Sequence, residues 1–354
     1  MDKYFVETVL ILYIIPILLI SFLGVAILLF INRFTIININ ASNKKLRDKI
    51  NDFLPNFFLS GLSEIEKNAE IEKFKNEVNP NSYRFKEILI ESLIESKTSL
   101  RGVDKKEFLR IYDAFNLHKH SYKLFKSPSI YDKKKGINQF EMMDYKSAAK
   151  DVERYIYHKN RKLSVNALIA YIILTEKDLS FLLNIKYQPS FTKEIEILEI
   201  CKTRKLKRPE LLKDFLFSKN DFIVRMGLRL AAYYNASDLE SEIANCINHE
   251  NPEIRELAYK AVSDLFLVDK ADDLISRYRK ETINNQTQIA VSLGEIGNER
   301  HLIFLKSLLL LRDHHELEIA KAIKSINPEA LFKMANYNER IDSLEKHVNE
   351  NLLK

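Results

Sequence analysis

A helical pattern recurs along the second half of this chain of 354 residues at intervals of about 30 residues. The segment NPEIRELAYKAVSDL (251–265) aligns with NDFIVRMGLRLAAYY (220–234), so that Ala231 corresponds to Ala261. Ala258 then corresponds to Ala290 and to Ala320 in later copies. Each copy carries its apolar residues on one stripe of a helix, and a second helical segment follows it. Because one such pair cannot bury its own stripe, the pairs are expected to stack on their neighbours.

Polar residues that can cap a helix stand at the start of each copy: Asp221, Asn251, Asn285 and Asp313. The last of them begins the triplet DHH (313–315), which also occurs in a phosphoesterase signature. The other acidic and histidine motifs of such enzymes are absent. We therefore interpret Asp313 as a cap and His314 and His315 as part of the first helical turn.

The composition favours an all-α protein, because the chain has 7 Gly, 8 Pro and no Trp beside abundant Leu, Ile, Lys and Glu. Cys201 and Cys246 form neither a disulfide framework nor a zinc spacing, so we expect buried thiols in a reducing compartment. His118 and His120 would point apart on a helix, which favours solvated side chains over a metal site. No nucleotide-binding or hydrolase motif occurs. The sequence thus predicts no enzyme, no catalytic residue, no metal and no cofactor.

Residues 9–31 contain no charged residue. These 23 residues would form a helix of about 35 Å, enough to cross a bilayer core of about 30 Å. They have neither the basic leader nor the cleavage site of a signal peptide. Lys3 alone precedes the segment, whereas several basic residues follow it: Arg33, Lys44, Lys45, Arg47 and Lys49. The positive-inside rule therefore predicts a single-pass protein of the inner (cytoplasmic) membrane, with its N-terminus outside and its body in the cytoplasm.

The chain divides on these grounds into four parts. They are a transmembrane anchor (1–33), a helical juxtamembrane region (34–136), an array of paired helices (137–336) and a charged C-terminal helix or tail (337–354). The run SPSIYDKKKG (127–136) is the predicted boundary, because Pro, Ser, Gly and a lysine block disfavour continued helix. Within 34–136, Pro55 is expected to interrupt a helix that stops near Gly61.

The repeats at 215–334 resemble HEAT repeats, in particular the short HEAT-like units of bacterial proteins. The resemblance implies an α-solenoid whose long exposed surface binds a partner. The family often carries an arginine in the first helix of each unit that bonds to the preceding turn. Arg225 and Arg255 match that position, whereas Thr287 and Leu317 depart from it. The resemblance therefore implies that Arg225 and Arg255 stabilise packing, and that curvature is less regular toward the C-terminus.

Residues 202–208 form a basic cluster that can serve a protein, a lipid headgroup or nucleic acid, although a solvated turn between helices would look alike. Candidate partner-binding residues are those of the cluster and one arginine that we expect to be exposed: Lys202, Arg204, Lys205, Lys207, Arg208 and Arg229.

We expect a membrane-tethered, non-enzymatic scaffold that binds a protein partner at the membrane. Similarly arranged proteins suggest an accessory of a membrane glycosyltransferase or of other envelope machinery. The alternative is a nucleic-acid-handling or lyase-type HEAT-like enzyme. The net charge of +6 and the lack of Trp argue against nucleic acid, and self-association is left open.

Overall fold

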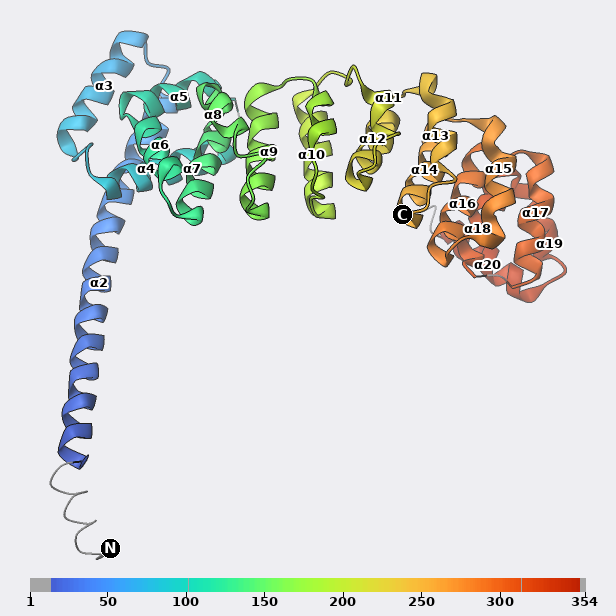
Figure 1. Ribbon diagram of the computed structural model, residues 1–354, viewed down its shortest axis with the longest axis horizontal. Coiled ribbons are helices and arrows are strands. Elements are labelled where there is room, and N and C mark those ends of the chain that lie inside the picture. The colour runs from blue at the N-terminus through green and yellow to red at the C-terminus, as the bar shows by residue number, and fades with distance from the viewer. Residues whose placement is uncertain (1–13, 101, 313, 351–354) are drawn as a thin grey trace, which may run out of the picture. The chain divides into compact units, whose positions relative to one another are not determined.

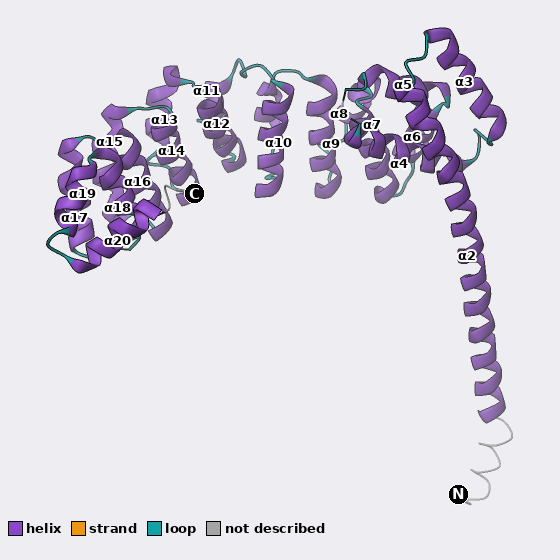
Figure 2. Ribbon diagram, turned by 180° about the vertical axis from the view of Figure 1, so that it is seen from behind, coloured by secondary structure: helices purple, strands orange, loops and turns teal. Residues whose placement is uncertain are grey.

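The computed structural model describes residues 14–100, 102–312 and 314–350, and every regular element among them is a helix (Figures 1 and 2). The prediction of an all-α protein is confirmed. The chain forms two compact units, Met1–Ala149 and Lys150–Lys354. The short helix α8 (Ala149–Glu153) lies at this division.

Helix α2 (Ile15–Leu59) is long and apolar enough to cross a membrane. Its large apolar side chains from Ile17 to Ile37 are exposed, whereas those from Ile50 onward are mostly buried. The part of the predicted span before residue 14 lies outside the described residues. The helix is continuous from the apolar segment into the packed part of the first unit (Figure 1).

The interruption expected at Pro55 is wrong, because α2 continues through this residue to Leu59. A proline inside a helix loses one hydrogen bond and costs about 3 kcal/mol. The adjacent Phe53, Leu54 and Phe57 are buried in the core of the unit, and this burial offsets the cost. The end of the helix near Gly61 is as predicted, with Gly61 at a φ of 63°.

Five further α-helices belong to the first unit: α3 (Glu64–Glu77), α4 (Tyr83–Ser99), α5 (Lys105–Ala114), α6 (Leu117–Lys126) and α7 (Ile130–Met143). Helices α3 and α4 contact α2. Helices α2 to α5 share a core rich in aromatic rings, in which the Phe53 ring stacks on Phe74 at 4.2 Å. The 3-10 turn η2 (Lys146–Ala148) follows α7.

Residues 127–129 separate α6 from α7 as predicted, but residues 130–136 are helical, since α7 begins at Ile130 with Ser129 as its N-cap. Gly136 lies inside this helix because α6 comes very close there. A Cβ atom at Gly136 would lie 2.7 Å from the backbone nitrogen of Phe125. The glycine thus permits close helix packing, and the division between the two units follows Ala149.

In the second unit, one row of helices consists of α9 (Arg161–Thr175), α10 (Phe191–Arg204), α12 (Asp221–Tyr233), α14 (Pro252–Asp264), α16 (Ile283–Ile296) and α18 (Glu316–Ile326). Each contacts the next along the chain (Figure 1). A second set of helices alternates with them: α11 (Leu212–Phe215), α13 (Glu240–Cys246), α15 (Ala271–Arg277), α17 (Glu299–Leu310) and α19 (Pro328–Ala335). Helix α20 (Glu339–Glu350) packs on α18 and α19. The 3-10 turns of this unit are η3 (Leu179–Asn184), η4 (Ser237–Leu239), η5 (Val268–Lys270) and η6 (Tyr278–Lys280).

Three consecutive helices of the row end in the same way. Lys205, Asn235 and Phe266 follow α10, α12 and α14 with φ of 50°, 51° and 53°. After Asn235, the Ala236 N–H donates to the carbonyl of Ala231, and the Leu267 N–H donates to that of Val262 after Phe266. These are Schellman motifs, in which a left-handed residue closes the helix. Local structure therefore repeats with the interval of about 30 residues seen in the sequence.

The predicted N-cap at Asn251 is confirmed, since its side chain accepts from the Glu253 N–H at 2.9 Å. The caps of α12 and α16 are instead Asn220 and Thr282. Asp221 accepts a hydrogen bond from Asn251, and the buried Asn285 donates to the Pro252 carbonyl, so both connect neighbouring helices. Asp313 lies outside the described residues.

His315 precedes α18 at a φ of 64°, so neither His314 nor His315 belongs to the first turn of that helix. Both cysteines are free and buried, as predicted. Burial raises the pKa of Cys201 to about 12 and that of Cys246 to about 11.

Candidate functional site

The second unit carries a groove of about 810 Å³ across the C-terminal halves of four neighbouring helices of the row. We call it the α10–α16 groove. It is lined by Ile195, Leu198 and Lys202 of α10, Leu228, Arg229, Ala232 and Tyr233 of α12, Leu257, Lys260, Ala261, Ser263 and Asp264 of α14, Phe266, and Glu295 of α16.

The floor of the α10–α16 groove is apolar: Ile195, Leu198, Leu228, Ala232, Leu257 and Ala261. Residues three or four positions apart lie on one face of a helix, so each helix contributes its floor residues to the same side. Ala232 and Ala261 have short side chains, which leave room between the larger residues. A hollow with this floor suits an apolar ligand surface.

Two aromatic side chains stand at the rim. Phe266 is 70% exposed and Tyr233 is 36% exposed. A left-handed backbone costs a residue other than glycine about 1–2 kcal/mol, and Asn is the residue that usually bears it. Asn235 occupies the equivalent position after α12, whereas the position after α14 holds Phe266. Phe266 therefore presents an exposed aromatic ring on a left-handed backbone beside the apolar hollow.

The charge of Arg229, the arginine that lines the groove, is compensated by a buried carboxylate of α10. Glu194 of α10 is fully buried, and Arg229 donates to its carboxylate at 2.8 Å while Arg225 donates through two nitrogens, at 2.5 Å in the shortest bond. The Arg229 guanidinium also lies over the Phe191 ring at 5.3 Å. Burial lowers the pKa of Arg229, although Glu194 opposes this effect. The prediction of an exposed Arg229 is wrong, because its side chain is 10% exposed.

Two carboxylates at the other end of the groove lack such partners. Asp264 and Glu295 form no ion pair with another described residue. Partial burial of the Asp264 carboxyl raises its pKa, the Glu295 charge raises it further, and Lys260 opposes the shift. The α14–α16 end of the groove thus carries two carboxylates without an ion pair and one nearby lysine, Lys260, and we call it the acidic end.

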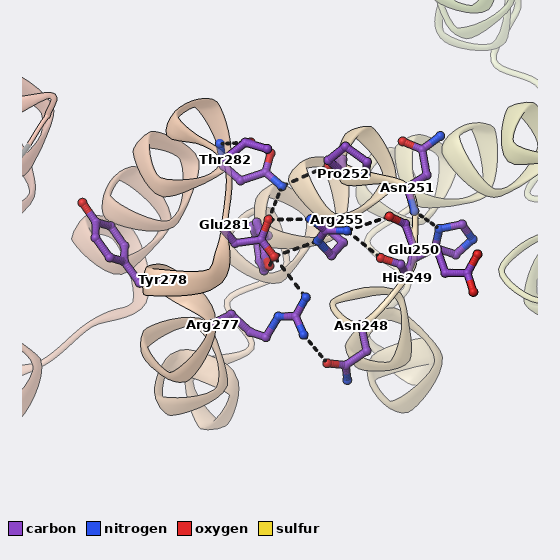
Figure 3. A network of polar contacts seen from close by, with 12 residues as sticks. Asn248, His249, Glu250, Asn251, Pro252, Arg255, Arg277, Tyr278, Glu281 and Thr282 are labelled. Carbon is purple, nitrogen blue, oxygen red and sulfur yellow. Dashed lines mark hydrogen bonds and ion pairs between the residues drawn. The ribbon is translucent and has the colours of Figure 1, made fainter.

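A buried polar network fixes α14 against α16, and with them this acidic end (Figure 3). Its centre is Glu281, just before α16, whose carboxylate accepts hydrogen bonds from four side chains: Arg255, Tyr259, Arg277 and Asn285. Burial alone would raise the pKa of Glu281, but these donors outweigh it and hold the pKa at about 2. Glu281 is therefore a structural anion held by four donors.

Most of the predicted basic cluster lies away from the groove. Arg204, Lys205, Lys207 and Arg208 line a second hollow of about 260 Å³ that also contains Glu176, Asp178 and Glu210. Arg204 pairs with Glu176 at 3.1 Å, and Arg208 binds both oxygens of Asp238 at 2.8 and 2.6 Å. Lys202 lines the groove and pairs with Glu199 at 2.9 Å. Of the six predicted residues, the structure brings Lys202 and Arg229 to the groove.

Of the two histidines of the first unit, His118 is partly exposed, whereas His120 is not solvated, contrary to expectation. His120 is buried, with its Nε2 2.5 Å from Glu87, while the His118 ring stacks on Tyr145. They face different partners, as their spacing on a helix predicts. Within the described ranges, no cluster of three or more His, Cys, Asp or Glu residues is suited to a metal ion.

Sequence reasoning missed Tyr233, Phe266, Asp264 and Glu295. A signal for the groove was nevertheless present, because Leu228 and Ala232 recur 29 residues later as Leu257 and Ala261. Identical apolar pairs at the same spacing in successive helices predict a shared face. Comparisons of the chain with protein-family models, with curated proteins and with solved structures found no match.

Proposed function

We propose that this protein is a membrane-tethered, non-enzymatic scaffold whose HEAT-like α-solenoid binds a protein partner in the α10–α16 groove. The observation that carries the proposal is the groove itself, with its apolar floor and aromatic rim. Apolar side chains in a hollow beside exposed aromatic rings are the composition of protein-binding surfaces.

The tether supports a partner at the same membrane. Helix α2 is exposed over its apolar part and continues directly into the packed first unit. Confinement to a surface raises the effective concentration of a scaffold for other membrane proteins. The proposed arrangement has the N-terminus outside and the body on the cytoplasmic side of the inner membrane. The proposed machinery is a membrane glycosyltransferase or another envelope assembly, on the resemblance described above.

The test is affinity purification of tagged full-length protein from solubilised membranes, comparing two matched pairs of substitutions. The groove variant is Tyr233→Ala with Phe266→Asn, since Asn tolerates the left-handed backbone at 266. The control is Tyr157→Ala with Phe217→Ala, which removes two exposed rings outside the groove.

We expect a membrane protein to co-purify in stoichiometric amount with the wild type and the control and to be lost from the groove variant. A partner retained by the groove variant would refute the groove as the binding site. A soluble partner that binds equally well after deletion of residues 1–33 would refute the role of the tether.

A further inference from the structure

We propose that the α10–α16 groove receives a basic amphipathic helix, of the kind found where a partner membrane protein leaves the bilayer on the cytoplasmic side. This inference rests on the proposed function and adds the chemistry of the bound segment. Its support comes from the charges of the groove, its dimensions and the location of the protein.

The charged side chains of the groove differ in their pairing, and the difference favours a positive ligand. Arg229 is compensated by the buried Glu194, and Lys202 by Glu199. Asp264 and Glu295 form no ion pair with another described residue, and the Glu295 charge disfavours ionisation of Asp264. Lys260 lies close to Asp264 without forming an ion pair with it. A lysine or arginine from outside would give this end the partner that the fold does not provide.

The floor fits one helix. Neighbouring helices pack with axes about 8–10 Å apart, so a floor spanning α10, α12 and α14 is roughly 20 Å long. A helix rises 1.5 Å per residue, so about 13 residues would cover it. An apolar face with anchors at i, i+3, i+4 and i+7 is the usual ligand of a hydrophobic groove. Within the described part of the chain, no strand offers an edge for an extended peptide.

The proposed location selects the sign of the ligand. Segments that follow a transmembrane helix on the cytoplasmic side are enriched in Lys and Arg. Such a segment, when amphipathic, presents an apolar stripe flanked by positive charge. The acidic end of the groove and its apolar floor match these two features respectively.

The experiment measures binding of two fluorescein-labelled 18-residue model helices to full-length protein in phosphatidylcholine nanodiscs. Both peptides carry the same leucine face, and their polar positions are all Lys in one and all Glu in the other. Fluorescence anisotropy is recorded at low and at high salt, with empty nanodiscs as the lipid control. The groove is altered by Asp264→Asn with Glu295→Gln. The matched control is Asp269→Asn with Asp273→Asn, two exposed acids that do not line the groove.

We expect the Lys peptide to bind at least about tenfold more tightly than the Glu peptide at low salt, a preference of about 1.4 kcal/mol. The preference should shrink at high salt and nearly vanish in the groove variant, while the control variant keeps it. Equal affinities for the two peptides, an unchanged preference in the groove variant or binding no stronger than to empty nanodiscs would overturn the inference. The same follows if the wild type binds neither peptide.

These failures are distinguishable from failure of the proposed function. If the Tyr233 and Phe266 substitutions abolish co-purification of a partner but the peptide preference is absent, the scaffold stands and the basic helix is wrong. If co-purification survives those substitutions, the proposed function itself fails.

Discussion

Arg255 of α14 and Glu281, 26 residues later, are joined by two parallel hydrogen bonds. Nε donates to Oε1 at 2.7 Å and Nη2 donates to Oε2 at 2.8 Å. The remaining guanidinium nitrogen of Arg255 donates to the carbonyls of His249 and Glu250 in the turn before its own helix. One arginine thus ties that turn, helix α14 and the start of α16 together (Figure 3). Bidentate pairs of this kind fix orientation as well as adding energy.

The Glu281 network predicts a specific dependence of stability on pH. The carboxyl has a pKa of about 2 in the folded protein and an ordinary value of 4.5. Its contribution is therefore complete above pH 4.5 and is lost as the pH falls toward 2, by about 3 kcal/mol at most. We expect Glu281→Gln to lower the free energy of unfolding at pH 7 and to flatten its dependence on pH in the acid range.

The measurement is denaturant unfolding followed by circular dichroism at several pH values, with Glu250→Gln as the control. Glu250 is exposed and lies five residues before Arg255, and it joins the network only through its backbone carbonyl. Parallel curves of stability against pH for wild type and Glu281→Gln would contradict the assignment of this carboxylate as a structural anion.

Replacing Gly294 of α16 by alanine is expected to change stability in the direction opposite to that usual for glycine in a helix. Replacing glycine by alanine in a helix ordinarily stabilises by about 0.5–1 kcal/mol. A Cβ atom at Gly294, however, would lie 2.8 Å from the Cα atom of Ala322 in α18, so these helices would have to separate. We expect Gly294→Ala to destabilise by about 1–3 kcal/mol, measured as a lower thermal midpoint. Gly24→Ala, in helix α2 where no atom lies within 4 Å, should not lower that midpoint.

Sequence patterns predicted helices well where the signal is local. The cap at Asn251 and the repeat of about 30 residues follow from side chains that act within one or two turns. Pro55 and Gly136 lie inside helices, although each of these residue types ordinarily ends one. Here Pro55 is retained by the burial of Phe53 and Phe57, and Gly136 by its contact with α6. The residues that bury Phe53 and Phe57, and the α6 backbone that contacts Gly136, belong to other helices, so no local pattern identifies them.

The candidate site was harder to predict for the same reason. The cluster 202–208 is conspicuous in the sequence because its charges are adjacent, whereas the carboxylates that neutralise it, such as Asp238, are distant in sequence. The position of Arg229 in its own helix is typical of a surface residue. Its burial depends on the ion pair with Glu194, which belongs to the preceding helix of the row. Phe266 gives no signal, since its left-handed backbone is a position where Asn or Gly is expected.

The basic cluster is predicted to contribute little to stability. The Arg208–Asp238 pair is substantially exposed, with 38% and 60% of the two side chains accessible, and such pairs contribute about 0–1 kcal/mol. We expect alanine at Arg204, Lys205, Lys207 and Arg208 together, with the groove residue Lys202 kept, to leave the helical content unchanged and to shift the thermal midpoint by only a few degrees. Loss of the folded state in this variant would show that the pairs with Glu176 and Asp238 hold the helices together. If the variant folds but no longer binds the partner, the contact surface extends beyond the groove to this cluster.

Replacing Asp264 by asparagine is expected to weaken partner binding without lowering stability. Its pKa is raised in the folded protein, mainly by partial burial, so the ionised carboxylate is less favourable there than in the unfolded chain. Relative to a neutral side chain, stability is therefore lost as the pH rises from the ordinary value of 3.8 through the folded pKa. We expect Asp264→Asn to unfold at pH 7 no more easily than the wild type, and its stability relative to the wild type to rise between acid and neutral pH.

The same variant should bind the partner more weakly, because a positive group in the groove loses its counter-charge. Thermal unfolding at pH 4 and pH 7, together with co-purification, checks both halves. An Asn variant that is less stable at pH 7 and binds normally would make Asp264 a structural residue and leave the acidic end of the groove without a role.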